Sequence, residues 1–144
     1  MEIKKITKPE LPGAMGLVWE VFQEFEGPDY SQEGIDSFKA HIDRQEKEAT
    51  IAMFGAFEED ELLGVIATRD EGRHISLFFV SGKHHRQGVG RKLFEQIIPL
   101  TDSSFITVNS SPYAVEVYRR LGFSATEDEQ LTNGIRYVPM EYKK

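Results

Sequence analysis

The residues best suited to chemistry form one basic segment with two glycines, KHHRQGVGR, from Lys83 to Arg91. It follows an apolar run, Ile75 to Val80, that is typical of a strand, and it leads into a helical pattern from Gly88 to about Leu100. The start of a helix leaves N–H groups unpaired, its dipole favours negative charge, and glycine lets the main chain approach a ligand closely. A strand, a glycine-rich turn and a helix in this order therefore predict a phosphate site.

The charge around this segment contrasts with that of the whole chain, which has a formal net charge of −7. Residues 73–94 contain no acid, and their basic residues are Arg73, Lys83, Arg86, Arg91 and Lys92. A local positive region in an acidic protein favours a small polyanion, whereas nucleic acid calls for a broad basic face. We therefore expect no nucleic-acid partner.

Composition narrows the class of protein further. With 144 residues and 40% hydrophobic content, the chain predicts a single domain, residues 1–144, with a substantial core. It has no apolar run of membrane-spanning length and no signal-peptide pattern, and it has no cysteine. These features fit a cytoplasmic protein and exclude cysteine chemistry. The four histidines show no helical pair at ligand spacing, so we expect no metal site.

Hydrophobic periodicity predicts the elements that must position the segment. The expected elements are a strand at 3–6, helices at about 11–26 and from 31, strands at 51–57, 62–68 and 75–80, a helix at 88–100, a strand at 105–109, a helix at 112–121, and strands at 123–126 and 135–142. The order β-α-α-β-β-β-α-β-α-β-β predicts a mixed α/β sheet of the α+β kind.

Two motifs carry a resemblance to a known family. The sequence HRQGVG, from His85 to Gly90, resembles the (Gln/Arg)-x-x-Gly-x-(Gly/Ala) signature of the GNAT acyltransferase superfamily. The sequence AVEVYRRLGF, from Ala114 to Phe123, is similar to the family's Ala-x-x-x-Tyr-x-x-x-Gly-Phe ending. The predicted element order also matches the family over nearly the whole chain. His85 is a departure, because the family usually has Gln or Arg at that position.

The resemblance implies a site for acetyl-CoA as co-substrate, with no metal. Main-chain groups of Phe78 and Val80 would meet the pantetheine arm, in a wedge between two splayed central strands. Asn109 would hydrogen-bond the pantetheine amides. The pyrophosphate would be wrapped by the main-chain amides of Arg86, Gln87, Gly88, Val89, Gly90 and Arg91.

The resemblance also implies direct transfer of an acetyl group to a primary amine of a small molecule or peptide. Tyr118 matches the tyrosine that protonates the departing CoA thiolate in many relatives, and the amide near Val80 would donate to the developing oxyanion. The sequence leaves the general base open among Glu24, Glu26, His74 and water.

Other interpretations stand beside these. Tyr118 at helical spacing also fits a core aromatic, and Asn109 also fits a simple strand end. A CoA-binding sensor that has lost catalysis is the alternative function, whereas a P-loop enzyme is excluded because the loop lacks Gly-Lys-Ser/Thr. The oligomeric state is open, although many relatives form homodimers. An acidic run is either a solvated face or an attractor of a cationic amine, and its members are Glu20, Glu24, Glu26, Asp29, Glu33 and Asp36.

Overall fold

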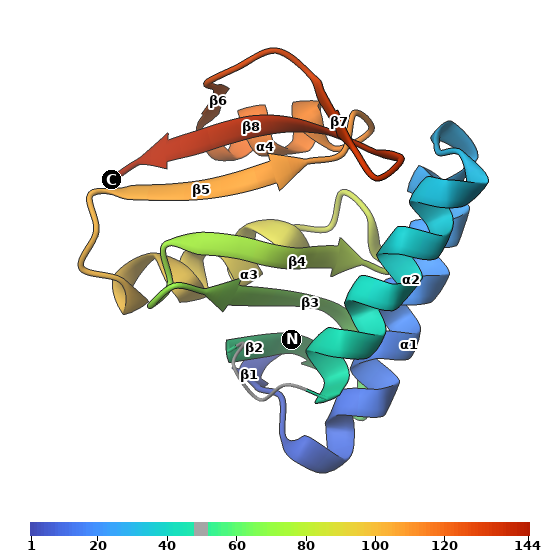
Figure 1. Ribbon diagram of the computed structural model, residues 1–144. Helices are drawn as coiled ribbons and strands as arrows, with labels where there is room; N and C mark the ends of the chain where they lie inside the picture. Colours follow the sequence, from blue (N-terminus) through green and yellow to red (C-terminus); the bar gives the residue numbers. More distant parts are fainter. Residues whose placement is uncertain (48–51) are drawn as a thin grey trace.

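A computed structural model describes residues 1–47 and 52–144, and these form one mixed sheet with helices on both faces. The strands are β1 (Glu2–Lys5), β2 (Ala52–Glu58), β3 (Glu61–Arg69), β4 (His74–Val80), β5 (Phe105–Ser110), β6 (Phe123–Ala125), β7 (Gln130–Thr132) and β8 (Ile135–Lys143). They follow the order β1-β2-β3-β4-β5-β8-β6, and β7 pairs with β8 away from this path. The predicted mixed α/β fold is confirmed (Figure 1).

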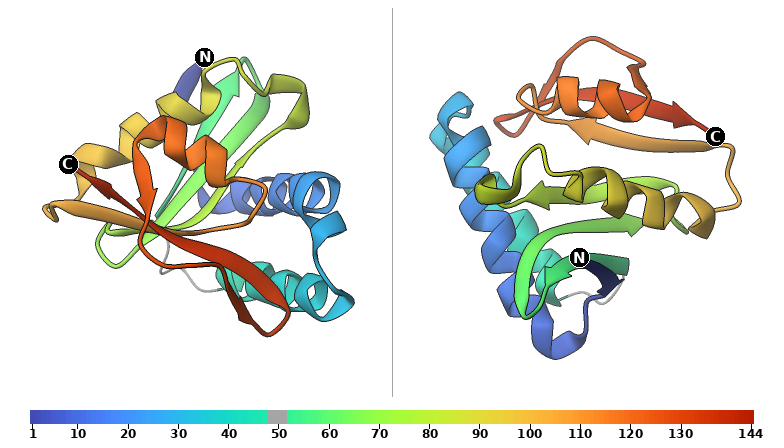
Figure 2. Two further views of the ribbon diagram at one scale, coloured as in Figure 1. Left: turned by 90° about the horizontal axis from the view of Figure 1, so that it is seen from above. Right: turned by 180° about the vertical axis from the view of Figure 1, so that it is seen from behind.

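Four α-helices cover the sheet: α1 (Leu11–Val21), α2 (Gln32–Lys47), α3 (Val89–Ile97) and α4 (Val115–Leu121). Figure 2 shows α1 and α2 on one side of the sheet and α3 on the other. The sheet thus separates two apolar cores, one under α1 and α2 and one under α3 and α4. β3 is buried on both faces, which explains why its sequence reads as a continuous apolar run. No helix in the described ranges is both long and apolar enough to span a membrane.

The central strands β4 and β5 are parallel but pair only at His74–Thr107 and Ile75–Val108. Just beyond Ile75, β4 carries an extra residue, Ser76, because Ile75 pairs with Thr68 and Leu77 pairs with Ala67. A bulge of this kind bends its strand. From here β4 continues with β3, while β5 and β8 stand apart from it, so the predicted splayed pair is confirmed (Figure 1).

Secondary structure departs from the sequence prediction at three places. The first helix is α-helical only to Val21 and continues as a wider π-helical turn, Phe22–Glu26. α4 begins at Val115, so Pro112 precedes the helix and does not lie in its first turn. Strand β7 was not predicted. The strand predicted from Ile51 begins at Ala52 in the described chain, and Ile51 itself lies outside the described residues.

Candidate functional site

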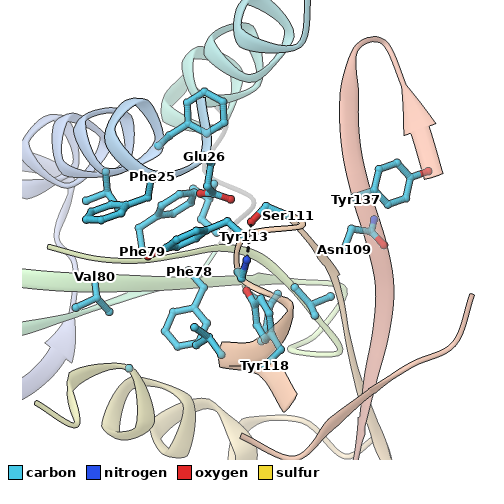
Figure 3. Close-up of a pocket in the computed structure, with 18 of the residues that line it drawn as sticks. Phe25, Glu26, Phe78, Phe79, Val80, Asn109, Ser111, Tyr113, Tyr118 and Tyr137 are labelled. Carbon is cyan, nitrogen blue, oxygen red and sulfur yellow. Dashed lines mark hydrogen bonds between the residues drawn. The ribbon is translucent and has the colours of Figure 1, made fainter. Parts of the chain in front are cut away.

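A cleft of about 720 Å³ lies where β4 and β5 diverge. Its walls come from β4, the start of α3, the β5–α4 connection, the π-helical turn and the β7–β8 hairpin. Figure 3 shows Phe78 and Tyr118 below the cleft and Phe25 and Glu26 above it. Segments distant in sequence therefore face one another across one opening.

The open edge of β4 presents main-chain groups to this cleft. The Ser81 amide donates to the Leu63 carbonyl at 2.8 Å. Because hydrogen-bonding direction alternates along an antiparallel strand, the main-chain groups of Val80 and Phe78 point away from β3, toward the side that β5 has left. His85 Nε2 lies 2.8 Å from the Val80 carbonyl oxygen and donates to it. His85, the residue that departs from the family signature, therefore occupies the Val80 carbonyl. The Val80 amide faces the cleft.

The N-terminus of α3 forms the floor at one end of the cleft. Gly88, its N-cap residue, has φ +81°, a left-handed conformation that glycine adopts without strain. No side chain of the described residues caps the helix, so its first amides keep their free hydrogen-bonding capacity. Gly88 and Gly90 leave the main chain without a side chain at two positions here, and an added Cβ on Gly90 would lie 3.5 Å from the Phe78 ring. This arrangement suits an anion.

Cationic side chains surround the same end. Arg86 and Arg91, two residues of the predicted phosphate site, line the cleft, and so does Arg120, which the sequence did not single out. Arg91 Nη2 donates to the Arg120 carbonyl at 3.0 Å, which ties the start of α3 to the end of α4. Arg120 has no distinguishing sequence signal, because an arginine on the last turn of a helix is ordinary. Gln87 does not line the cleft, and its side chain bonds the Lys83 carbonyl within its own loop.

Tyr118 lies between the two ends of the cleft and is 6% exposed. Its ring makes edge contacts with Phe78 and Phe123, at centroid distances of 5.8 and 5.2 Å. Burial raises the pKa of Tyr118 well above its usual range, and the nearby Glu26 carboxylate raises it further. The phenol is therefore kept protonated, as a hydrogen-bond donor must be.

Glu26 ends the π-helical turn and lines the cleft opposite Tyr118 (Figure 3). Removal from water raises the pKa of Glu26 to about 7, although an interaction with the Ser111 hydroxyl opposes part of that shift. Glu24 lines a separate hollow beside Ser81. His74 hydrogen-bonds Thr107 Oγ1 at 2.8 Å and does not line the cleft. Of the three side chains considered as the base, only Glu26 faces the cleft.

A sequence profile described as an acetyltransferase (GNAT) domain matches residues 26–144. The chain belongs to the GNAT acetyltransferase family. Comparison with curated protein sequences found no match.

Solved GNAT structures share the fold at low sequence identity. A GCN5-related N-acetyltransferase from Rhodopseudomonas palustris is 16% identical, with a TM-score of 0.85 over 99% of this chain and 95% of the other. The PaiA N-acetyltransferase from Thermoplasma acidophilum, solved in complex with coenzyme A, is 20% identical, with a TM-score of 0.71 over 99% and 98%. An aminoglycoside 6′-N-acetyltransferase complexed with coenzyme A is 12% identical, with a TM-score of 0.68 over 99% and 97%.

Within this GNAT fold, the structure brings most of the sequence-predicted residues to one cleft. Phe78 and Val80 line it from β4, and Asn109 lines it from β5 as an exposed residue. Figure 3 shows Asn109 close to Tyr137 of β8. Ser111 and Tyr113, which the sequence did not predict, line the cleft from the loop before α4. The described residues include no group of three or more metal-ligand side chains suited to hold an ion.

Proposed function

We propose that this GNAT protein is an acetyl-CoA-dependent N-acetyltransferase that transfers the acetyl group directly to a primary amine. One observation carries the proposal: a single cleft joins the uncapped N-terminus of α3, a protonated Tyr118 and a carboxylate, Glu26, whose pKa lies near neutrality. Such a reaction needs a site for an anionic pyrophosphate, a proton donor for the leaving thiolate and a base for the ammonium ion, and these three groups can serve those purposes.

The cofactor end of the cleft fits coenzyme A in three ways. Glycine at positions 88 and 90 leaves the main chain bare at these two positions, and the first amides of α3 suit a pyrophosphate. Arg86 and Arg120 add positive charge to the same end. The main-chain groups of β4 that lack a strand partner suit the amides of the pantetheine arm.

The chemistry needs proton transfers at two side chains, Glu26 and Tyr118. Ionised Glu26 accepts a proton from the ammonium form of the acceptor and releases it to solvent, which leaves a nucleophilic amine. The amine nitrogen forms a bond to the thioester carbonyl carbon, and the Val80 amide donates to the carbonyl oxygen. The carbon–sulfur bond then breaks, Tyr118 donates its proton to the sulfur, and the proton lost by the new amide nitrogen restores the phenol.

The direct test is titration calorimetry with acetyl-CoA and CoA, followed by thiol release with a panel of primary amines. We expect micromolar binding and thiol release that depends on an amine. Binding without release from any amine would favour the catalytically silent sensor, a function that Glu26 at this position argues against. Absence of binding would contradict the proposal.

A further inference from the structure

The acceptor end of the cleft is aromatic, in contrast to its cationic cofactor end. Phe22 stacks on Phe38 at a centroid distance of 4.0 Å, and Phe38 contacts Phe79 at 5.9 Å. Tyr30 meets Phe22 edge-on at 5.4 Å. All four rings line the cleft, and we call them the aromatic wall; Phe22 and Phe79 are buried, at 1% and 8% exposure, so Tyr30 and Phe38 provide most of its accessible surface. Such a surface binds flat, apolar groups and attracts cations.

Two further tyrosines, Tyr113 and Tyr137, line this end from the β5–α4 loop and from β8. Phe25 stacks on Tyr113 at 5.6 Å, so a ring from the π-helical turn touches a ring from the far side of the splay. Figure 3 shows Phe25, Tyr113 and Tyr137 distributed around Glu26 and Ser111. A ligand that enters here meets aromatic rings from both halves of the protein.

Glu26 supplies the acceptor end with its charge. Among the described residues that line the cleft, it is the only carboxylate. Glu129 does not line the cleft and is paired with Arg136, with Nε of Arg136 and Oε2 of Glu129 2.9 Å apart. Glu20 and Glu24 line the other hollow. The acidic run seen in the sequence therefore contributes one charge to this site.

The β7–β8 hairpin limits the length of this end. Its residues Thr132 and Asn133 line the cleft. The hairpin is fastened to the start of α2, because Ser37 Oγ donates to the Asn133 carbonyl at 2.9 Å and a methyl group on Gly34 would overlap the Gly134 carbonyl. The fixed hairpin is therefore one boundary of the acceptor end, which suits a small molecule.

From these observations, and resting on the proposed function, we propose that the acceptor is a small monoamine with an aromatic body, of the arylalkylamine class. Its ammonium group lies against Glu26, and its ring packs on the aromatic wall. A polyamine needs a second anion deeper in the site, and the described lining has no carboxylate besides Glu26. The lining also carries polar groups, among them Asn109, Ser111, Thr132 and Asn133, but the aromatic rings of this end favour a flat apolar body over a hydroxyl-rich sugar.

Equilibrium binding to the CoA-loaded protein tests the proposal without requiring turnover. The probes are 2-phenylethylamine, 2-phenylethanol, which lacks the cation, and spermidine, which lacks the ring. We expect 2-phenylethylamine to bind at least tenfold more tightly than either, because each control loses one of the two contacts. Tighter binding of spermidine, or equal binding of 2-phenylethanol, would overturn the proposal.

Two variants locate the contacts. Glu26→Gln is expected to weaken 2-phenylethylamine binding more than tenfold, whereas Glu24→Gln, two positions away in the other hollow, leaves it unchanged. Tyr137→Leu keeps apolar volume but removes an aromatic face, so we expect a loss of roughly three- to tenfold with CoA affinity retained. Equal effects of the two glutamine variants would contradict the assigned position of the ammonium group.

Steady-state preference separates this inference from the proposed function. Acetylation of 2-phenylethylamine with a kcat/KM at least tenfold above that of spermidine supports both. Acetylation of spermidine in preference to 2-phenylethylamine refutes the acceptor class and keeps the N-acetyltransferase. Failure to bind CoA refutes the proposed function itself, while amine binding to the free protein still reports on the acceptor end.

Discussion

The two ends of the cleft are built in opposite ways. The cofactor end comes mainly from one continuous stretch, β4 to the start of α3, and presents main-chain groups with glycine at two positions. The acceptor end presents side chains from four separate segments. The first runs from the π-helical turn into α2, and the others are β4, the β5–α4 loop and the β7–β8 hairpin. A ligand shared by many proteins can be held by backbone, whereas a particular ligand needs particular side chains.

The largest expected effect is at the cofactor end. Gly90→Asp places a carboxylate on the first turn of α3, so CoA binding should fall at least a hundredfold through repulsion, while an acid near a helix N-terminus leaves the fold stable. Calorimetry and thermal melting measure the two quantities. Gly90→Ala is the control, because its methyl group lies at ordinary contact distance from Phe78. If Gly90→Asp weakens CoA binding no more than Gly90→Ala does, the phosphate does not bind here.

Tyr118 lies between the ends and should affect turnover alone. Tyr118→Phe is expected to lower kcat roughly ten- to a thousandfold with CoA affinity nearly unchanged, because it removes one proton donor and keeps the ring packing against Phe78 and Phe123. Steady-state kinetics with calorimetry on the same preparations measure both. Unchanged kcat would assign Tyr118 to the core.

At the acceptor end, Glu26 should set the pH dependence of activity. With a pKa of about 7, the carboxylate accepts protons only above that pH, so kcat/KM should rise through pH 7 and then level off. Glu26→Gln should remove this rise and lower kcat/KM about ten- to a hundredfold at pH 8. A pH profile that is the same in Glu26→Gln and wild type would exclude Glu26 as the base.

The same residue should cost stability. The folded-state pKa of Glu26 is raised from 4.5 to about 7. The stability that the protonated carboxyl group gives the folded protein is therefore fully present below pH 4.5 and is lost as pH rises through 7. At pH 8, Glu26→Gln should therefore raise the free energy of unfolding by about 1–3 kcal/mol, with little change at pH 4. Urea melts at both pH values measure this, and a less stable variant at pH 8 would contradict the prediction.

The smallest expected effect is electrostatic steering. If the exposed acids near the acceptor end attract a cationic amine, kcat/KM should fall a few-fold as ionic strength rises, with kcat little changed. Because only Glu26 of the acidic run lines the cleft, the effect should stay modest. A flat salt profile would leave the acidic run as a solvated face.

The difference between the ends also explains what sequence could predict. The fold was predictable, and so was the position of Gly88 and Gly90 between a strand and the start of a helix, since strand and helix periodicity and these glycines are local signals. The acceptor end was not. The π-helical turn that brings Glu26 to the cleft has no sequence signature, β7 spans only Gln130–Thr132, and the aromatic wall looks like core residues. Glu26 could be named as a candidate base, but only its position relative to Tyr118 distinguishes it from Glu24.

The contact between Gly34 and the β7–β8 turn has a consequence for how the molecule is made. It joins segments about a hundred residues apart, since the Ser37–Asn133 hydrogen bond spans 96 positions and the Tyr30–Arg136 hydrogen bond spans 106. On the ribosome, the segments of the cofactor end emerge well before β8, whereas the acceptor chamber cannot close until the last strand has been released. We expect amides of the β7–β8 hairpin to gain protection late in pulse-labelled refolding, so that specificity is the last property that the growing chain acquires.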